Sequence, residues 1–171
     1  MATEGSNLSH YEEDSIPDAS QMLIGIVVSE WNRSITDNLK EGAYSALIKH
    51  GMKPENIKVQ YVPGSFELPL GASMFLEFDE KMDGVICLGS VIQGETRHFE
   101  FVCQACAQGV KDVALKYNKP VIFGLLTDDN MQQAIDRSGG KHGNKGIECA
   151  IAAIKMISFH DDLKYGGYRD K

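Results

Sequence analysis

The sequence predicts an α/β protein in which a four-stranded parallel sheet lies between helices on both faces, a three-layer sandwich. Short apolar runs alternate along the chain with segments of helical periodicity. The first run, residues 22–28, is continuously apolar, which is typical of a strand covered on both faces. Strands that alternate with helices need crossover connections, and these connections build parallel sheets.

The length, charge and composition of the chain exclude several classes of function. At 171 residues the chain is most simply one domain, long enough to bury a substantial core. Its formal net charge of −7 and its lack of a Lys or Arg run argue against nucleic acid or an anionic membrane as partner. No apolar run approaches the ~20 residues of a membrane span, and the polar N-terminus is no secretory signal. We therefore expect a cytoplasmic protein.

The four cysteines lie within apolar patterns. Cys103 and Cys106 have C-x-x-C spacing, but they fall in the middle of an expected helix. The sequence therefore predicts buried thiols rather than a redox or zinc pair. No set of His, Cys, Asp and Glu has the spacing of metal ligands, so we expect no metal.

The N-terminal half contains an arm and two strand–helix units. Residues 1–21 show neither helical nor strand periodicity. This predicts an arm, flexible or packed on a neighbouring subunit, before a domain of residues 22–171. The strand at 22–28 leads through a polar loop to a helix, for which Ser34 and Asp37 suggest a capping box. Residues 57–61 alternate as a second strand, and Pro69 suits the first turn of a helix that runs toward Phe78.

The C-terminal half continues the alternation. Residues 84–88 form the third strand, which leads through residues 89–98 into a long amphipathic helix. The fourth strand, 120–126, precedes a short helix ending at Arg137. A glycine-rich break at 138–146 leads to the final helix. This pattern predicts a small doubly wound sheet of the flavodoxin-like kind.

Ligands of such folds bind outside the carboxyl ends of the strands. That rule gathers Trp31, residues 65–67, residues 90–98 and Phe123 at one edge of the sheet. All the unusual loop residues fall on the same side, and this coincidence predicts a site.

The turn at residues 89–98 carries the clearest chemistry. Gly94 permits a sharp bend, while Glu95 and Thr96 fall where a new helix presents unpaired N–H groups. Such a turn favours a phosphate. His98 is the only ionisable group of the turn with an ordinary pKa (about 6.5) near neutrality. The turn indicates an enzyme acting on a small phosphorylated substrate; an ordinary loop with a surface histidine is the alternative.

The other candidates each have two interpretations. Trp31 and Phe66 could stack on a heteroaromatic ring, or each could belong to the core. Glu67 could accept hydrogen bonds from ring N–H groups, or it could stabilise a helix N-terminus. Arg137 has the fork that grips phosphate and Lys145 supplies a point charge, or both could belong to a solvated hinge.

Four stretches, taken together, resemble the lumazine synthase family: residues 62–67 (Val-Pro-Gly-Ser-Phe-Glu), 89–98, 120–124 and 143–148. The resemblance runs from about residue 23 to residue 159. It implies condensation of 5-amino-6-ribitylaminouracil with 3,4-dihydroxy-2-butanone 4-phosphate to 6,7-dimethyl-8-ribityllumazine, the precursor of riboflavin, with loss of phosphate and water. It implies no metal or organic cofactor.

The resemblance also assigns roles. His98 matches the catalytic histidine, Trp31 the aromatic that stacks on the pyrimidine, and Glu95 and Thr96 the phosphate turn. The segments that hold the ring and ribityl chain match Ser65, Phe66 and Glu67, with Ser90, Val91 and Ile92. The residues that reach the site from an adjacent subunit match Phe123, Arg137 and Lys145. The resemblance therefore implies an active site at a subunit interface of a pentamer.

Some positions differ from the family pattern. Trp31 replaces a frequent Phe, Glu148 a frequent Asp, and Glu95 stands where a small residue is common. The Glu95 carboxylate must point away from a bound phosphate. The compact connection at 139–146 resembles that of members forming a hollow sixty-subunit shell, so assembly stays open between a lone pentamer and a shell. Riboflavin synthase is the candidate protein partner.

Three rival functions remain. A riboflavin synthase of related fold would have no phosphate to bind, so the turn at 94–96 argues against it. A flavodoxin-like electron carrier needs a hydroxyl-rich phosphate loop after the first strand, where this sequence has Ser-Glu-Trp-Asn at 29–32. A flavin- or lumazine-binding shell protein without activity is disfavoured by His98, Arg137 and Lys145.

Overall fold

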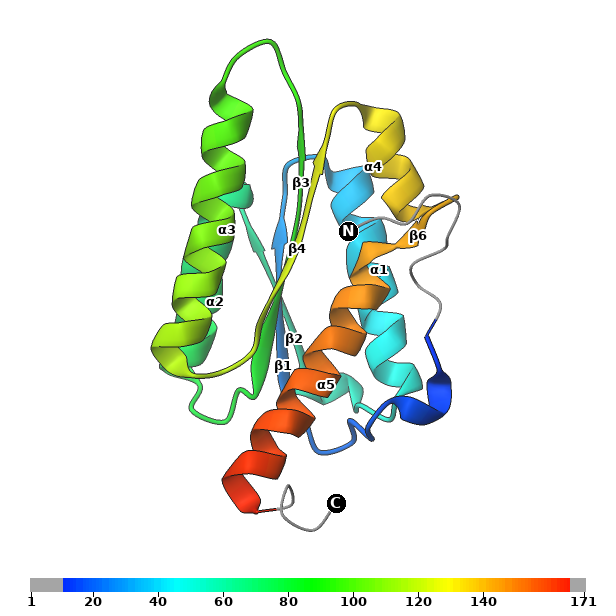
Figure 1. The fold of residues 1–171 in the computed structure, drawn as a ribbon, viewed down its shortest axis with the longest axis vertical. Helices are drawn as coiled ribbons and strands as arrows, with labels where there is room; N and C mark the ends of the chain where they lie inside the picture. Colours follow the sequence, from blue (N-terminus) through cyan, green and yellow to red (C-terminus); the bar gives the residue numbers. More distant parts are fainter. Residues whose placement is uncertain (1–10, 167–171) are drawn as a thin grey trace.

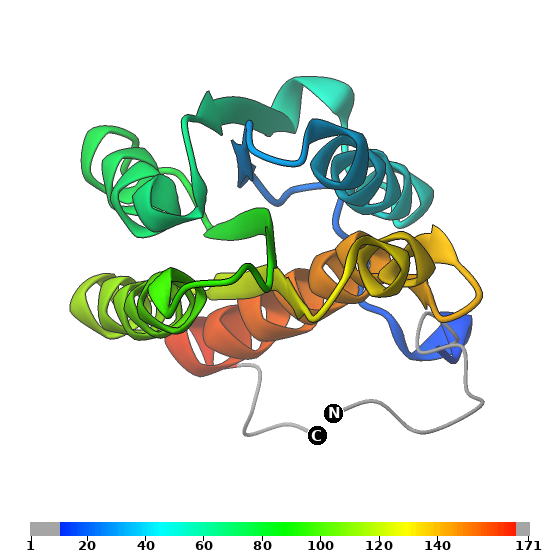
Figure 2. The same ribbon diagram turned by 90° about the horizontal axis from the view of Figure 1, so that it is seen from above.

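The computed structural model describes residues 11–166. Its main sheet has the strand order β2-β1-β3-β4, and every neighbouring pair is parallel. The strands are β1 (Ile24–Ser29), β2 (Ile57–Val62), β3 (Gly84–Ile92) and β4 (Val121–Asp128). Helices α2 (Leu68–Phe78) and α3 (His98–Tyr117) cover one face, and α1 (Arg33–Lys49) and α5 (Lys145–Tyr165) cover the other (Figures 1 and 2). The predicted three-layer α/β fold is confirmed.

Shorter elements connect these layers: the 3-10 turns η1 (Glu13–Ser15), η2 (Pro54–Asn56) and η3 (Ser65–Glu67), the helix α4 (Met131–Arg137), and a hairpin of β5 (Ser138–Gly140) and β6 (Gly143–Asn144). The hairpin occupies the stretch that we expected to be an irregular glycine-rich break. It leads directly into α5.

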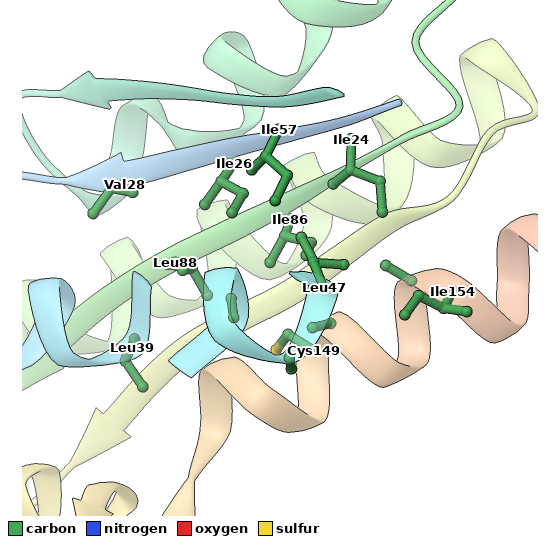
Figure 3. Packing of buried hydrophobic residues seen from close by; sticks show 14 of the residues in the cluster. Ile24, Ile26, Val28, Leu39, Leu47, Ile57, Ile86, Leu88, Cys149 and Ile154 are labelled. Atoms are coloured by element: carbon green, nitrogen blue, oxygen red, sulfur yellow. The ribbon is translucent and has the colours of Figure 1, made fainter. Parts of the chain in front are cut away.

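The core lies on both sides of β1, whose six residues are all buried. Ile24, Ile26 and Val28 face α1 and α5, where they pack with residues such as Leu39 and Ile154 (Figure 3). Val27 joins the second cluster, beneath α2 and α3. Burial of each such side chain contributes roughly 1.5–3 kcal/mol. The central strand is thus fixed from both faces, as its continuous apolar pattern predicted.

The cysteines belong to this packing. Cys87, Cys106 and Cys149 are buried, Cys103 is half-buried, and all four are free thiols. Burial raises the pKa of the thiols of Cys106 and Cys149 to about 12. The prediction of buried thiols is confirmed for Cys87, Cys106 and Cys149, whereas Cys103 is only half-buried.

Two local predictions were wrong. Helix α1 begins at Arg33 with Asn32 as its N-cap, so Ser34 and Asp37 form no capping box. Asp37 instead accepts a hydrogen bond from the Tyr61 hydroxyl at 2.9 Å. Strand β3 also extends to Ile92, four residues beyond its predicted end, because it continues to pair with β4 as far as Ile92 with Asp128.

Residues 11–21 lie against α1 of the same chain. The Tyr11 ring contacts the His50 ring, Ala19 is buried, and its N–H donates to the His50 carbonyl at 2.9 Å. The remaining part of the predicted arm, residues 1–10, lies outside the described residues. The proposed boundary between arm and domain stays a prediction.

Candidate active site

Two adjoining cavities open at the carboxyl ends of β1 and β3. The larger, about 490 Å³, is lined by Ser65, Phe66, Glu67 and Ser90, among others. The smaller, about 230 Å³, is lined by Ile92, Gly94 and Thr96, among others. Trp31, Val91 and His98 line both cavities. The structure therefore brings together candidates from three separate strand-to-helix connections.

The aromatic walls of this site are exposed. Trp31 follows β1 and is 71% exposed, and Phe66, in η3, is 62% exposed. The alternative that each belongs to the core is wrong. Glu67 both lines the larger cavity and stands at the N-cap of α2, so its position fits both interpretations of this residue. The accessible rings of Trp31 and Phe66 can stack on a planar ring, and the Glu67 carboxylate can accept hydrogen bonds from its polar groups.

A close approach at Gly89 lets Ser65, which lines the larger cavity, lie against β3. A Cβ atom there would lie 2.8 Å from the Ser65 hydroxyl and 2.9 Å from a Leu68 methyl group, so a larger residue would push η3 off β3. Ser65 and Ser90 are buried, and within the described part of the chain their hydroxyls have no hydrogen-bond partner. A buried hydroxyl without a partner is costly, and both residues line the larger cavity, so a polar ligand that paired with either hydroxyl there would relieve this cost.

The turn before α3 is open to solvent. Glu95, Thr96 and His98 are exposed, and the His98 N–H donates to the Thr96 hydroxyl at 3.5 Å. Gly94 does not have a positive φ, and a Cβ atom there would meet nothing within 4 Å. The bend that Gly94 permits therefore does not use the left-handed region of the backbone. The turn instead leaves open space over its backbone, next to the N-terminus of α3, where the Arg97 N-cap makes no side-chain capping bond.

Phe123 lies elsewhere than predicted. It is the third residue of β4 and is level with Cys87, well before the carboxyl end of the sheet. Its side chain is 38% exposed. The expectation that it shares the edge with Trp31 was wrong, because β4 continues for five residues beyond it to Asp128.

Arg137 and Lys145 form a second cluster, on the hairpin side of the sheet. Arg137 donates to the His142 carbonyl and to one Glu148 oxygen, each at 2.9 Å, and Lys145 donates to the other Glu148 oxygen at 2.9 Å. The Arg137 and Glu148 side chains are each only 16% exposed, so the solvated-hinge alternative is wrong for Arg137. Neither cation is among the residues that line the two cavities.

Asp128, at the carboxyl end of β4, lies close to this cluster. Burial raises the pKa of its carboxyl group, and the nearby Arg137 charge opposes that shift. One of its oxygens has no hydrogen-bond partner within residues 11–166.

Two further observations limit the chemistry. Among residues 11–166, no helix combines the length and apolar character that crossing a membrane requires. Nowhere in the same range do three or more His, Cys, Asp or Glu side chains cluster as metal ligands would.

Comparison with known proteins identifies the family. The family model of 6,7-dimethyl-8-ribityllumazine synthase matches residues 21–161. This range includes all the residues that line the two cavities and the cluster of Arg137, Lys145 and Glu148. The chain belongs to this family.

Similar proteins of the same name come from several bacteria. The lumazine synthase of Parabacteroides distasonis is 57% identical over 159 residues, which cover 93% of this chain and 99% of the relative. That of Christiangramia forsetii is 52% identical over 96% of this chain and 98% of the relative, and that of Cytophaga hutchinsonii 56% identical over 92% and 98%. The resemblance seen in the four motifs is confirmed.

Sequence reasoning missed three residues that lie in or beside these two groups of candidates. Asn32 lines the smaller cavity, Asp128 lies beside Arg137, and Asn144 caps α5 and donates to the Asn38 carbonyl at 2.9 Å. A signal existed only for Asn144, because an asparagine between a glycine-rich stretch and an apolar periodic segment is a typical N-cap.

Proposed function

We propose that this chain condenses 5-amino-6-ribitylaminouracil with 3,4-dihydroxy-2-butanone 4-phosphate to give 6,7-dimethyl-8-ribityllumazine, phosphate and water, the penultimate step of riboflavin biosynthesis. Membership of the family supports the reaction. One observation carries the assignment of residues: Trp31, Val91 and His98 line both of two adjoining cavities, one with aromatic walls and one beside an open helix N-terminus. Two different substrates need two adjoining subsites with a proton carrier between them.

The larger cavity suits the aminouracil. Its ring would stack on Trp31 and Phe66, and the Ser65, Glu67 and Ser90 side chains would bind its polar groups, as the two unpartnered hydroxyls suggest. Val91 and Ile92 would contact the ring and the ribityl chain.

The smaller cavity suits the phosphorylated ketone. The phosphate would lie over the turn, held by backbone N–H groups and by the Thr96 hydroxyl. The exposed position of Glu95 leaves its carboxylate free to turn outward, away from the phosphate.

His98 is the proposed catalytic residue. The 5-amino group of the aminouracil attacks the ketone, water is lost, and the resulting imine must give up a proton before phosphate can leave. The enol formed by that elimination becomes a ketone, which the ribityl-bearing nitrogen attacks, and loss of a second water closes the new ring. Each of these steps moves a proton near neutral pH, and His98 lies beside both subsites. The remaining acceleration would come from holding the two reactants together. No metal or organic cofactor enters these steps.

The oligomer is proposed as part of the mechanism. The chain exposes an α2 face, made of Phe66, Leu70, Met74, Phe78 and Phe101. It also exposes a β4 face, made of Leu115, Phe123, Met156, Phe159 and Leu163, four of which line a groove of about 800 Å³. Apolar patches of this kind usually mark interfaces.

Because the two faces consist of different residues, contact between them would be heterologous, the kind of contact that builds a closed ring when the rotation between neighbours closes. Phe66 belongs both to the cavity and to the α2 face, and Phe123 belongs to the β4 face. A neighbour docked in this way could bring Phe123, Arg137 and Lys145 to the site. We therefore propose a homopentamer, alone or within a sixty-subunit shell. The free thiols fit the cytoplasm, and riboflavin synthase is the proposed protein partner.

The test mixes purified protein with the aminouracil and the butanone phosphate. Lumazine fluorescence and released phosphate are followed above the uncatalysed background. Matched production of both would establish the synthase. No acceleration, in protein shown to be folded and assembled, would leave the fold intact and favour a binding or shell role.

A further inference from the structure

Asn32 has an unusual conformation beside the site. It lies directly after Trp31, with φ 56° and ψ 48°, in the left-handed region. An asparagine at a helix N-cap normally has an extended backbone, and its side chain accepts a hydrogen bond from the first turn. Within residues 11–166, the Asn32 side chain makes no such bond to α1. Its Nδ2 atom donates instead to the Ser90 carbonyl on β3, at 3.0 Å.

The sheet explains why that carbonyl is available. The pairing of β1 with β3 ends at Val28 with Leu88, but β3 continues to Ile92. Beyond Leu88 the edge of β3 that faces β1 needs donors from another source, because buried backbone carbonyls are costly without partners. The Asn32 amide supplies one. Asparagine is suited to this task because it tolerates the left-handed region better than most residues do.

The same bond fixes the loop that carries Trp31. Just before the tryptophan, the Glu30 N–H donates to the Val62 carbonyl at 2.9 Å. Just after it, Asn32 holds the chain to Ser90. The Trp31 side chain is 71% exposed, so few side-chain contacts of its own hold it in place. Its backbone is anchored on both sides, and the Asn32 anchor is attached to the strand that supplies Ser90, Val91 and Ile92.

We propose that Asn32 is a positioning residue that holds Trp31 at a fixed place across the cavity from β3, ready to stack on the aminouracil ring. This inference rests on the proposed function. Preorganisation of this kind reduces the ordering that binding would otherwise cost. Loss of the anchor is therefore expected to weaken aminouracil binding while leaving proton transfer by His98 largely intact.

The test uses two variants. Asn32→Gly keeps access to the left-handed backbone but removes the donor, and Asn32→Asp keeps the side-chain size while placing a carboxylate against a carbonyl. From the usual net value of one hydrogen bond, we expect KM for the aminouracil to rise about three- to tenfold, with kcat changed less than about twofold. Because Trp31 is the only tryptophan, its fluorescence anisotropy should also fall without any substrate.

Asn118→Gly is the matched control. Asn118 is the other asparagine with positive φ (49°) in residues 11–166, and it lies at the C-cap of α3. The Asn118→Gly variant should leave both the tryptophan anisotropy and KM for the aminouracil unchanged. Unchanged anisotropy and KM in both Asn32 variants would overturn the proposal. So would equal effects in Asn118→Gly, or a loss of kcat as large as the rise in KM. If the unmodified protein shows no synthase activity, the proposed function fails, and the anisotropy alone decides on the anchor.

Discussion

His98 occupies the one position that borders both cavities and begins a helix. It is exposed, and its hydrogen bond to the Thr96 hydroxyl uses its backbone N–H and not its ring. The imidazole is thus free to meet a substrate from either side. A residue with this freedom can serve several proton transfers in one reaction, which the proposed condensation requires.

Replacing His98 with alanine should slow turnover by about 10²–10⁴-fold, the usual contribution of a general acid–base. Activity should not vanish, because the two subsites still bring the reactants together. Steady-state rates of lumazine and phosphate formation measure the effect. His50→Ala, at the far end of α1, serves as the control and should keep full activity. Complete loss of activity in an assembled His98→Ala protein would indicate a more essential role, such as covalent chemistry.

The sequence predicted correctly those site residues whose position follows from the strands and helices next to them in the chain. Trp31 lies in the connection that follows β1 and His98 ends the connection that follows β3, so the rule about carboxyl ends places them correctly. Asn32 was missed because its partner, the Ser90 carbonyl, is 58 residues away in the chain. The capping box was wrongly predicted for the same reason, since the partner that Asp37 takes, Tyr61, is 24 residues away. Side-chain partners across the fold are not encoded in local patterns.

At the scale of elements, the β5–β6 hairpin determines where the two cations lie. Asn144 accepts from the Gly146 N–H at 2.8 Å and donates to the Ser138 carbonyl at 3.2 Å, which joins the hairpin to the start of α5. The chain also packs tightly here, since a Cβ atom on Gly146 would lie 1.9 Å from the Leu39 carbonyl oxygen. Arg137 and Lys145 are therefore held at the two ends of a rigid connection, with Glu148 between them.

Changing Glu148 to glutamine should destabilise the protein. The carboxylate accepts from both cations in a largely covered position, and its loss would leave two positive charges facing one another. From the usual cost of removing a hydrogen bond to a charged group, we expect the free energy of unfolding to fall by about 1.5–3 kcal/mol. Denaturant unfolding at one fixed protein concentration measures this change.

The exposed pair of Lys111 and Asp112 provides the control for that experiment, because its side chains are 60% and 66% exposed. Asp112→Asn should cost less than about 0.5 kcal/mol, as exposed ion pairs usually do. Equal losses of unfolding free energy in Glu148→Gln and Asp112→Asn would show that the low exposure of the Glu148 ion pairs does not strengthen them. If Arg137 grips the phosphate, as one interpretation of its sequence position holds, Glu148→Gln should also not raise KM for the butanone phosphate.

Element types followed from periodicity, whereas their ends and pairings did not. The apolar pattern of β3 indicated a strand, but its last four residues are held by β4, a partner that the local pattern does not reveal. The glycine-rich stretch 138–146 was predicted to be irregular, because isolated glycines indicate a break. Two short strands form there, since Ser138 and Asn144 pair across the turn.

At the scale of the whole molecule, the two apolar faces lead to a test of assembly. In a ring, each subunit would use its α2 face against the β4 face of the next. A charge placed in either face should then prevent closure, because burying an unpaired charge is costly. Met74→Glu alters the α2 face, where Met74 is 49% exposed, and Leu163→Glu alters the β4 face, where Leu163 is 56% exposed. Each variant alone should be monomeric and nearly inactive.

Mixing the two variants separates a ring from a symmetric dimer. The Leu163→Glu chain keeps an intact α2 face and the Met74→Glu chain an intact β4 face, so the mixture should form a one-to-one dimer that cannot grow. Its one intact interface would join the Trp31 cavities of the first chain to Phe123, Arg137 and Lys145 of the second, so part of the activity should return. Native mass spectrometry and the condensation assay measure the two effects, with Ile48→Glu, outside both faces and 36% exposed, as the control. Separate homodimers of each variant would instead indicate that each face pairs with itself, and the proposed ring would be wrong.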